Sequence, residues 1–231
     1  SIQIPIICTF VFLFITIVLF FEAEIKYRIM CGIVCAFDVK QTTEELRPQI
    51  LEMSKKIRHR GPDWSGIFSN EKAILAHERL AIVDPASGKQ PLFSADKRYV
   101  LAANGEIYNH HALIEKYGYA DKLRGRSDCE FLKYYYAEHG IEKMCHELRG
   151  EFALAIFDID RINKTMKFHL VRDALSVRPL FIGTDSDGFG FCSEMKGLSN
   201  IIDKTEIRQL KGGFSYHVTY DLNRKDVTFE E

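Results

Sequence analysis

The stretch MCGIVCAF, residues 30–37, looks like the opening of a protein, yet twenty-nine residues precede it. From Cys31 to Phe37 the stretch is apolar and rich in strand-forming residues, which predicts a buried strand. Cys31 at its head has two interpretations. It is either a nucleophile at the start of the functional protein or an ordinary buried cysteine, the commoner role of a lone thiol.

Residues 1–29 form an apolar leader. Its part from residue 2 to residue 21 has no charged side chain and has about the length that a membrane-spanning helix needs. It lacks the basic start and the A-x-A cleavage site of a secretory signal, and the chain begins with serine rather than methionine. Three interpretations stay open: translated upstream sequence, a membrane anchor through residues 2–21, or a cleaved targeting peptide. With the first, we expect a cytoplasmic protein.

The composition is that of a globular protein with balanced charge. Lys and Arg number 31 and Asp and Glu number 32, which leaves a formal net charge of −1. This balance argues against nucleic acid as a partner. The six cysteines show no C-x-x-C pair and no zinc-ligand spacing with histidine. We therefore expect reduced thiols and no metal site.

Helices are predicted at three places. Pro48 suits the first turn of a helix, where its missing N–H is harmless, and apolar residues at helical spacing follow it. Residues 127–130, Ser-Asp-Cys-Glu, read as an S-x-x-E capping box that starts a helix running through Tyr135. Gly150 is predicted to end the next helix.

Strands outnumber these helices. Residues 73–84 read as two short strands, and residues 98–110 as a strand that runs into an Asn-Gly turn. Further strand-like runs occupy residues 151–160, 166–173, 178–185 and 189–194. Because the connections are short, antiparallel pairing is favoured, and the predicted fold class is α+β with helices covering sheets.

A cysteine at a true N-terminus has its own general base. The free α-amine, with a pKa of about 7.7–8.0, can take the proton of a thiol whose pKa is about 8.5. The arrangement is the cysteine counterpart of the N-terminal threonine nucleophile. An acylated nitrogen is an amide and cannot act as the base. Cys31 can therefore be such a nucleophile only where everything before it has been removed or is not translated.

Six short motifs follow one another along the chain, and together they resemble the glutaminase domain of glutamine-hydrolysing asparagine synthetase. They are MCGI (30–33), HRGPDWSG (59–66), HERLAIVD (77–84), NGEIYNH (104–110), SDCE (127–130) and SEMKGL (193–198). The resemblance covers residues 30–215. It implies a class II glutamine amidotransferase with the N-terminal-nucleophile fold, in which two antiparallel sheets lie between helical layers.

The resemblance also assigns roles to residues. Cys31 would attack the carboxamide of L-glutamine, and the Asn104 side chain with the Gly105 N–H would form the oxyanion hole. Glu106 and Asp128 would receive the α-ammonium group of glutamine. The stretch from Arg79 onward would bind the substrate, with the Arg79 guanidinium on the α-carboxylate and the neighbouring positions Leu80, Ala81, Ile82 and Val83 beside it.

Each role has an ordinary structural alternative. Arg79 could form a surface ion pair with Glu78 or Asp84. Residues 104–105 could be a type I′ hairpin turn. Asp128 could be an acid that complements the dipole in the first turn of a helix.

The chain departs from the family pattern in several places. Ser176 stands where the family has glycine, which is tolerable only if that turn does not need a positive φ. Lys211-Gly212-Gly213 replaces a Pro-Gly pair. No SGGxDS pyrophosphate loop occurs in the chain, so residues 216–231 are interpreted as a truncated linker toward an ATP-dependent synthetase domain.

The resemblance therefore implies no cofactor for the glutaminase domain, with ATP and Mg used in the synthetase domain. Its expected partners are L-glutamine and that C-terminal domain, and a homodimer is a candidate assembly. Two other functions stay open. One is the glutaminase domain of another class II amidotransferase, and the other is a membrane-tethered, catalytically silent binding module.

Overall fold

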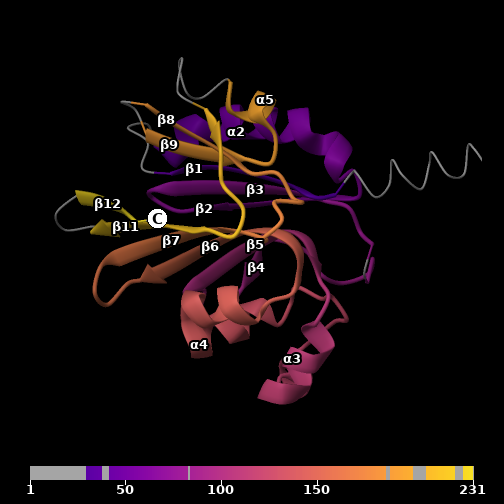
Figure 1. Ribbon diagram of the computed structural model, residues 1–231. Helices are drawn as coiled ribbons and strands as arrows, with labels where there is room; N and C mark the ends of the chain where they lie inside the picture. The colour runs from indigo at the N-terminus through magenta and orange to yellow at the C-terminus, as the bar shows by residue number, and fades with distance from the viewer. Residues whose placement is uncertain are drawn as a thin grey trace, which may run out of the picture.

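The computed structural model describes residues 30–37, 42–82, 84–185, 188–199, 207–221 and 226–230. Within these residues two antiparallel sheets of six strands each stack face to face, and helices cover the outer face of each sheet (Figure 1). This layered α+β arrangement confirms the predicted fold class. The leader and Val83 lie outside the described residues. None of the helices in the described part of the chain combines the length and the apolar character needed to span a bilayer.

One sheet contains the strand that begins after Cys31, and we call it the β1 sheet. Its strands, in spatial order, are β10 (Arg208–Gln209), β8 (Phe181–Asp185), β9 (Gly188–Cys192), β1 (Gly32–Phe37), β3 (Ala73–Arg79) and β2 (Trp64–Ser69). On its outer face lie α2 (Thr43–Ile57) and α5 (Met195–Leu198) (Figure 1). The 3₁₀ helix η1 (Arg58–Arg60) follows α2 directly.

The second sheet, the β5 sheet, is built from the other strands. Its spatial order is β12 (Asp226–Glu230), β11 (Ser215–Asp221), β7 (Thr165–Arg172), β6 (Gly150–Asp160), β5 (Tyr99–Ile107) and β4 (Leu92–Phe93). Below it lie α3 (His110–Tyr117) and α4 (Leu132–Glu147), with the short 3₁₀ helix η2 (Ala120–Lys122) between them in the chain (Figure 1). Residues 216–221, expected to be linker, thus lie in a strand of this sheet. Their alternation of buried and half-buried side chains matches the pleat.

The core lies between the two sheets. Ile33, Cys35 and Phe37 of β1 face this space, whereas Val34 and Ala36 face α2. Both faces of β1 are therefore buried, which explains why its sequence is apolar throughout. Phe37 stacks on Phe168 of β7 with ring centroids 5.8 Å apart, so the aromatic rings join one sheet to the other.

The first helix begins earlier than predicted. Thr42 is the N-cap of α2, its hydroxyl accepts the Glu45 N–H at 3.3 Å, and the Glu45 carboxylate accepts the Thr42 N–H at 2.9 Å. This is a complete capping box, and it satisfies two N–H groups of the first turn. Pro48 lies inside the helix rather than in its first turn. The placement from Pro48 was wrong because the T-x-x-E pattern upstream supplies the stronger start signal.

The predicted capping box at residues 127–130 does not form. The Ser127 hydroxyl accepts the N–H of Cys129 rather than that of Glu130, and the Glu130 carboxylate instead accepts the N–H of Gly125 at 2.9 Å. The helix begins only at Leu132 and continues to Glu147 across a kink at Gly140. The carboxylate of Glu130 thus closes the loop just before the helix instead of capping the helix, which the S-x-x-E pattern does not reveal.

Two strand predictions and one predicted helix end also change. Residues 73–84 contain one strand, β3, which ends at Arg79, rather than two. Residues 104–105 continue β5 in register with Ala153 and Phe152 of β6, so the Asn-Gly pair is not a turn. Gly150 starts β6 and does not end a helix. The later strands lie where they were predicted, and the strand pairs are antiparallel as expected.

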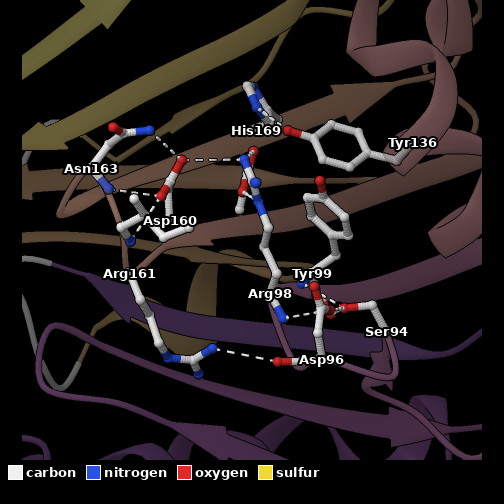
Figure 2. Close-up of polar contacts among 11 residues, drawn as sticks. Ser94, Asp96, Arg98, Tyr99, Tyr136, Asp160, Arg161, Asn163 and His169 are labelled. Carbon is white, nitrogen blue, oxygen red and sulfur yellow. Dashed lines mark hydrogen bonds and ion pairs between the residues drawn. The ribbon is translucent and has the colours of Figure 1, made fainter.

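A polar network lies at the end of β5 opposite to Asn104 (Figure 2). Arg98 donates to the Asp158 carboxylate at 2.7 Å and lies 3.5 Å from Asp160. Beside it, the Tyr136 hydroxyl of α4 meets His169 Nε2 of β7 at 2.9 Å, and His169 Nδ1 lies 2.5 Å from Nδ1 of His217. Burial lowers the pKa of His169 to about 3, so its ring is neutral at pH 7. The network fastens α4 and β11 to the middle of the sheet.

The turn after β7 has a left-handed backbone at residue 176, the position where the family pattern has glycine. Ser176 has φ +59°, in the left-handed region. The Arg172 guanidinium donates to the Ser176 carbonyl at 2.7 Å, and the Asp173 carboxylate accepts the N–H of Val177 at 3.1 Å. These buried side chains hold the turn in this conformation although residue 176 has a Cβ. Serine would be harmless here only if the turn did not need a positive φ, and the turn does need one.

Replacing Ser176 by glycine should stabilise the protein. The left-handed region costs a non-glycine residue about 1–2 kcal/mol, and part of the gain is offset by the extra freedom of glycine in the unfolded chain. We expect the free energy of unfolding to rise by about 0.5–1 kcal/mol, measured from urea transitions. Ser199, with φ −63°, provides the control, because glycine there should not stabilise. An equal effect at both positions would contradict the strain argument.

Candidate active site

The pleat of the strands directs four side chains into one end of the space between the sheets. They belong to Cys31, His77, Arg79 and Asn104. The register of β1 on β3 pairs Ile33 with His77 and Gly32 with Glu78, which places Cys31 beside Arg79. Because side chains alternate along a strand, His77 and Arg79 share the inner face with Leu75. By the same rule Asn104 of β5 faces inward from the opposite sheet.

The surroundings of Cys31 come from distant parts of the chain. The Leu80 N–H donates to Cys31 Sγ at 3.3 Å, and the thiol points back at the Leu80 carbonyl at 3.7 Å. Arg60 Nε donates to the Cys31 carbonyl at 3.1 Å, and its guanidinium lies 3.1 Å from the carboxylate of Glu194. Ser193 completes the frame, because its hydroxyl accepts the N–H of Ile33 at 2.9 Å. Two of the sequence motifs, at residues 59–66 and 193–198, thus hold the start of β1.

The Cys31 thiol is not activated by these neighbours. Burial raises the pKa of Cys31, and this effect outweighs the Leu80 hydrogen bond and the charges of Arg79 and Arg60, which act in the opposite direction. The thiol therefore stays protonated at neutral pH while its own nitrogen is an amide. A base is needed before it can act as a nucleophile.

A small pocket opens beside the thiol. Seven of the residues predicted for the site line it: Cys31, Arg79, Leu80, Ile82, Gly105, Glu106 and Asp128. Neither Asn104 nor Ala81 lines it: Asn104 is fully buried, and the Ala81 N–H donates to Asp63 at 2.8 Å. Val83 lies outside the described residues. The pocket measures about 30 Å³, enough for one water molecule. Met30, which is 3% exposed, also lines it.

The side-chain amide of Asn104 has unused hydrogen-bonding groups that a ligand could satisfy. It is fully buried, and neither its Nδ2 nor its Oδ1 has a hydrogen-bond partner among the residues that the structure describes. An unpaired buried polar group costs about 1–3 kcal/mol. A native protein retains such a group where a ligand or an ordered water molecule satisfies it.

Gly105, the next residue, cannot be another amino acid. It has φ +145°, and a Cβ there would lie 1.9 Å from the Glu151 carbonyl oxygen of the adjacent strand. The absence of a side chain lets β5 pass close to β6 while its backbone faces the pocket. The type I′ turn suggested for residues 104–105 is therefore replaced by a strand whose backbone lines a site.

Arg79 is not a surface residue. It is 5% exposed, and its guanidinium donates to the Asp84 carbonyl at 2.7 Å. Glu78 points to the other face of β3, where its carboxylate accepts the hydroxyls of Ser54 and Ser65 at 2.5 and 2.6 Å. The surface ion pair with Glu78 is thus wrong, because neighbouring strand residues face opposite sides.

Two carboxylates, those of Glu106 and Asp128, also line the pocket. Asp128 accepts the Ile107 N–H at 2.8 Å and precedes the first residue of α4, so the helix-dipole alternative does not describe it. Burial raises the pKa of Glu106, and the charges of Asp128 and Glu151 raise it further. A pocket lined by a guanidinium and two carboxylates suits a zwitterion such as a free amino acid.

Several lining residues of the pocket are not predicted from the sequence. Gly88, Gln90, Ser127 and Cys129 also line the pocket. Ser127 and Cys129 flank Asp128 in a motif that had been singled out, so their proximity could have been expected. Gln90 comes from a loop between strands, and no local pattern marks it. No group of three or more His, Cys, Asp or Glu side chains in the described part of the chain is arranged to hold a metal ion.

The fold and the site together define the class of N-terminal-nucleophile amidotransferases: paired antiparallel sheets, with a cysteine at the head of a central strand and a polar pocket beside it. Residues 30–226 match the glutamine amidotransferase domain family, and the chain belongs to that family.

Curated relatives agree with this assignment. The chain is 46% identical over 170 residues to asparagine synthetase B [glutamine-hydrolyzing] of Escherichia coli and 45% identical over 172 residues to asparagine synthetase [glutamine-hydrolyzing] 3 of Arabidopsis thaliana. The matches cover 73% and 74% of this chain but 30% and 29% of those proteins. The chain thus spans less than a third of the length of these relatives.

Solved structures share the fold. The glutamine phosphoribosylpyrophosphate (PRPP) amidotransferase from B. subtilis superposes with a TM-score of 0.67 at 18% identity, covering 87% of this chain and 49% of the other. At this level of identity the likeness shows the architecture only. It agrees with the two-sheet fold described above.

Proposed function

We propose that this chain, when Cys31 is its free N-terminus, hydrolyses L-glutamine to glutamate and ammonia. The observation that carries the proposal is the buried Asn104 side-chain amide, which lacks a partner among the described residues and directly precedes Gly105, a lining residue of the Cys31 pocket. Family membership and the asparagine synthetase relatives support the same activity.

The proposed reaction uses each group for one step. The Cys31 α-amine takes the thiol proton, and the thiolate sulfur attacks the carboxamide carbon of glutamine. The Asn104 Nδ2–H and the Gly105 N–H stabilise the negative charge that develops on the carboxamide oxygen. The protonated amine returns its proton to the leaving nitrogen, and ammonia departs. Water, deprotonated by the same amine, then hydrolyses the γ-glutamyl thioester to glutamate.

The charged walls of the pocket would hold the amino-acid end of the substrate. Arg79 presents a planar fork that matches the α-carboxylate. Glu106 and Asp128 would receive the α-ammonium, and Leu80 and Ile82, which line the pocket, would lie beside the bound substrate. A neighbouring substrate cation would lower the pKa of Glu106, which burial and nearby acids otherwise raise.

Met30 has to be absent for this chemistry. While it is present it makes the Cys31 nitrogen an amide, and it lines a pocket of about 30 Å³ that is too small for glutamine. We therefore propose that the functional domain begins at Cys31, after removal of Met30, and extends past residue 215 to include β11, which ends at Asp221.

The function of the whole protein is proposed from its relatives. They are named as glutamine-hydrolysing asparagine synthetases. We infer that ammonia from this domain is used with ATP, Mg and aspartate by a synthetase domain after residue 231, yielding asparagine, AMP and pyrophosphate. A homodimer, a cytoplasmic location and a membrane anchor through residues 2–21 stay predictions.

Two other functions remain as predictions that experiment can distinguish. Another class II amidotransferase would hydrolyse glutamine equally well but pass its ammonia to a different synthase domain. A silent binding module would bind glutamine with Cys31 acylated and release no ammonia. Measuring ammonia and glutamate release from L-glutamine separates the second alternative from the proposed function.

Changes at the two charged walls should weaken substrate binding more than chemistry. In Arg79→Lys a point charge replaces the bidentate fork, and we expect KM for glutamine to rise about 10-fold or more while kcat changes less. Asp128→Asn should act similarly at the ammonium end. Arg47→Lys, at an exposed position of α2, is the matched control. Steady-state ammonia release measures both constants, and unchanged KM in both pocket variants would show that the pocket is elsewhere.

A further inference from the structure

Just before Asn104, β5 pairs with β6 along one edge, but along its other edge a side chain takes the place of β4. In β4 only Leu92 and Phe93 pair with β5, opposite Leu101 and Val100. Continuing that register by two residues would bring residue 90 opposite Ala103. There the carboxamide of Gln90 replaces the missing backbone: its Oε1 accepts the Ala103 N–H at 2.6 Å, and its Nε2 donates to the Ala103 carbonyl at 3.2 Å.

A second side chain reaches the same carbonyl from the opposite sheet. His77 of β3 is fully buried, and its Nε2 lies 3.0 Å from the Ala103 oxygen. Burial lowers the pKa of His77 to about 4, so the ring is neutral at pH 7. Since a carbonyl only accepts, the proton must be on Nε2. His77 Nδ1 has no partner among the described residues, which agrees with this tautomer.

These contacts set the position of the residue that follows. The carbonyl of Ala103 and the N–H of Asn104 belong to one rigid peptide plane. The Asn104 amide has no hydrogen bond to a described residue that would orient it. Its position therefore depends on the backbone, which pairs with β6 along one edge, while Gln90 and His77 hold it at Ala103.

We propose that Gln90 and His77 are positioning residues for the oxyanion hole, acting through Ala103 on Asn104 and Gly105. The inference rests on the proposed function and adds to it two residues that touch neither the thiol nor the oxyanion. Donors that stabilise a developing charge must already be in place when the charge forms, and a displacement of about 1 Å can cost about 10²-fold in rate.

Gln90→Glu tests the clamp with almost no change in shape. A carboxylate still accepts the Ala103 N–H but cannot donate to the Ala103 carbonyl, and it repels that oxygen. In the chain that begins at Cys31 we expect kcat for glutamine hydrolysis to fall about 10-fold to 10²-fold, with KM changed less than about twofold. Gln49→Glu on α2 makes the same chemical change away from the pocket and should leave both constants unchanged.

A pair of inhibitors separates positioning from a general structural role. Glutamate occupies the amino-acid part of the pocket without needing the oxyanion hole, whereas glutamate γ-semialdehyde forms an adduct with Cys31 whose oxygen occupies that hole. We expect the inhibition constant of the aldehyde to rise by the factor by which kcat falls, and that of glutamate to stay the same. Equal weakening of both inhibitors, or no change in either, would overturn the inference.

Variants at His77 give an independent test. His77→Gln can place an amide nitrogen near the former Nε2 and should keep most of the activity, whereas His77→Leu has no donor and should lose it as Gln90→Glu does. Thermal unfolding by circular dichroism shows whether each variant is folded. If both His77 variants behave alike while folded, the inference fails. If the unaltered chain beginning at Cys31 releases no ammonia, the proposed function itself fails.

Discussion

Replacing Cys31 by alanine is expected to abolish release of ammonia from glutamine, a loss of at least about 10⁴-fold, because no other nucleophile lines the pocket in a comparable position. Cys129 is the other thiol in the lining, but burial raises its pKa well above the usual value. The Cys31 sulfur contacts the backbone of Leu80 and is not part of the inter-sheet core. The alanine variant should therefore fold normally and still bind glutamine.

The measurement pairs activity with binding. Ammonia release reports turnover, and calorimetry with L-glutamine reports whether the pocket is intact. Cys31→Ser should retain only a small fraction of the activity, since a hydroxyl is a much weaker nucleophile. Cys145→Ala, at a half-buried thiol that lines a different cavity, should leave turnover unchanged. Normal turnover in Cys31→Ala would remove this cysteine from the mechanism.

A free α-amine on Cys31 is expected to raise glutaminase activity by about 10²–10⁴-fold over the chain that keeps Met30, which is the usual contribution of a positioned general base. With Met30 attached, the Cys31 nitrogen carries no basic lone pair. The thiol pKa is raised by burial, so little thiolate forms without help. Met30 also occupies space at the pocket.

Two causes of inactivity, the missing base and the blocked pocket, can be separated. Acetylating the N-terminus of the chain that begins at Cys31 removes the base but adds a much smaller group than methionine. We expect this form to lose about as much activity as the form with Met30 while still binding glutamine. If the acetylated form is as active as the free one, the amine is not the base and Cys31 returns to its ordinary interpretation.

Much of the fold follows from local patterns that the sequence displays directly. The apolar run of β1 predicts a strand buried on both faces, and the later alternating runs predict β6, β7, β8 and β9, which lie where expected. Local rules failed where two signals compete. Pro48 alone predicts the start of the first helix too late, because the T-x-x-E pattern at Thr42 caps it earlier. The S-x-x-E pattern at Ser127 predicts a cap that does not form, because Glu130 binds the loop before the helix.

The sequence likewise indicates which residues are candidates for the site, but it does not indicate how they are arranged in space. Cys31, Arg79, Asn104 and Asp128 could be named from motifs, because their side chains carry the groups that an amino-acid substrate requires. That Asn104 and Gly105 form a strand rather than a turn depends on Glu151 of β6, which excludes any side chain at position 105. That Gln90 holds Ala103 depends on where β4 stops pairing.

The sequence by itself determined the periodicity of the strands, and its motifs led to the residues that we propose to carry the chemistry, including the proposed free amine on Cys31. Only the tertiary structure decided which of those residues meet. Cys31 contacts Leu80, 49 positions away, and Arg60 contacts Glu194, 134 positions away. The physical reason is that propensity and side-chain chemistry are properties of neighbouring residues, whereas such contacts are set by the register and packing of two whole sheets.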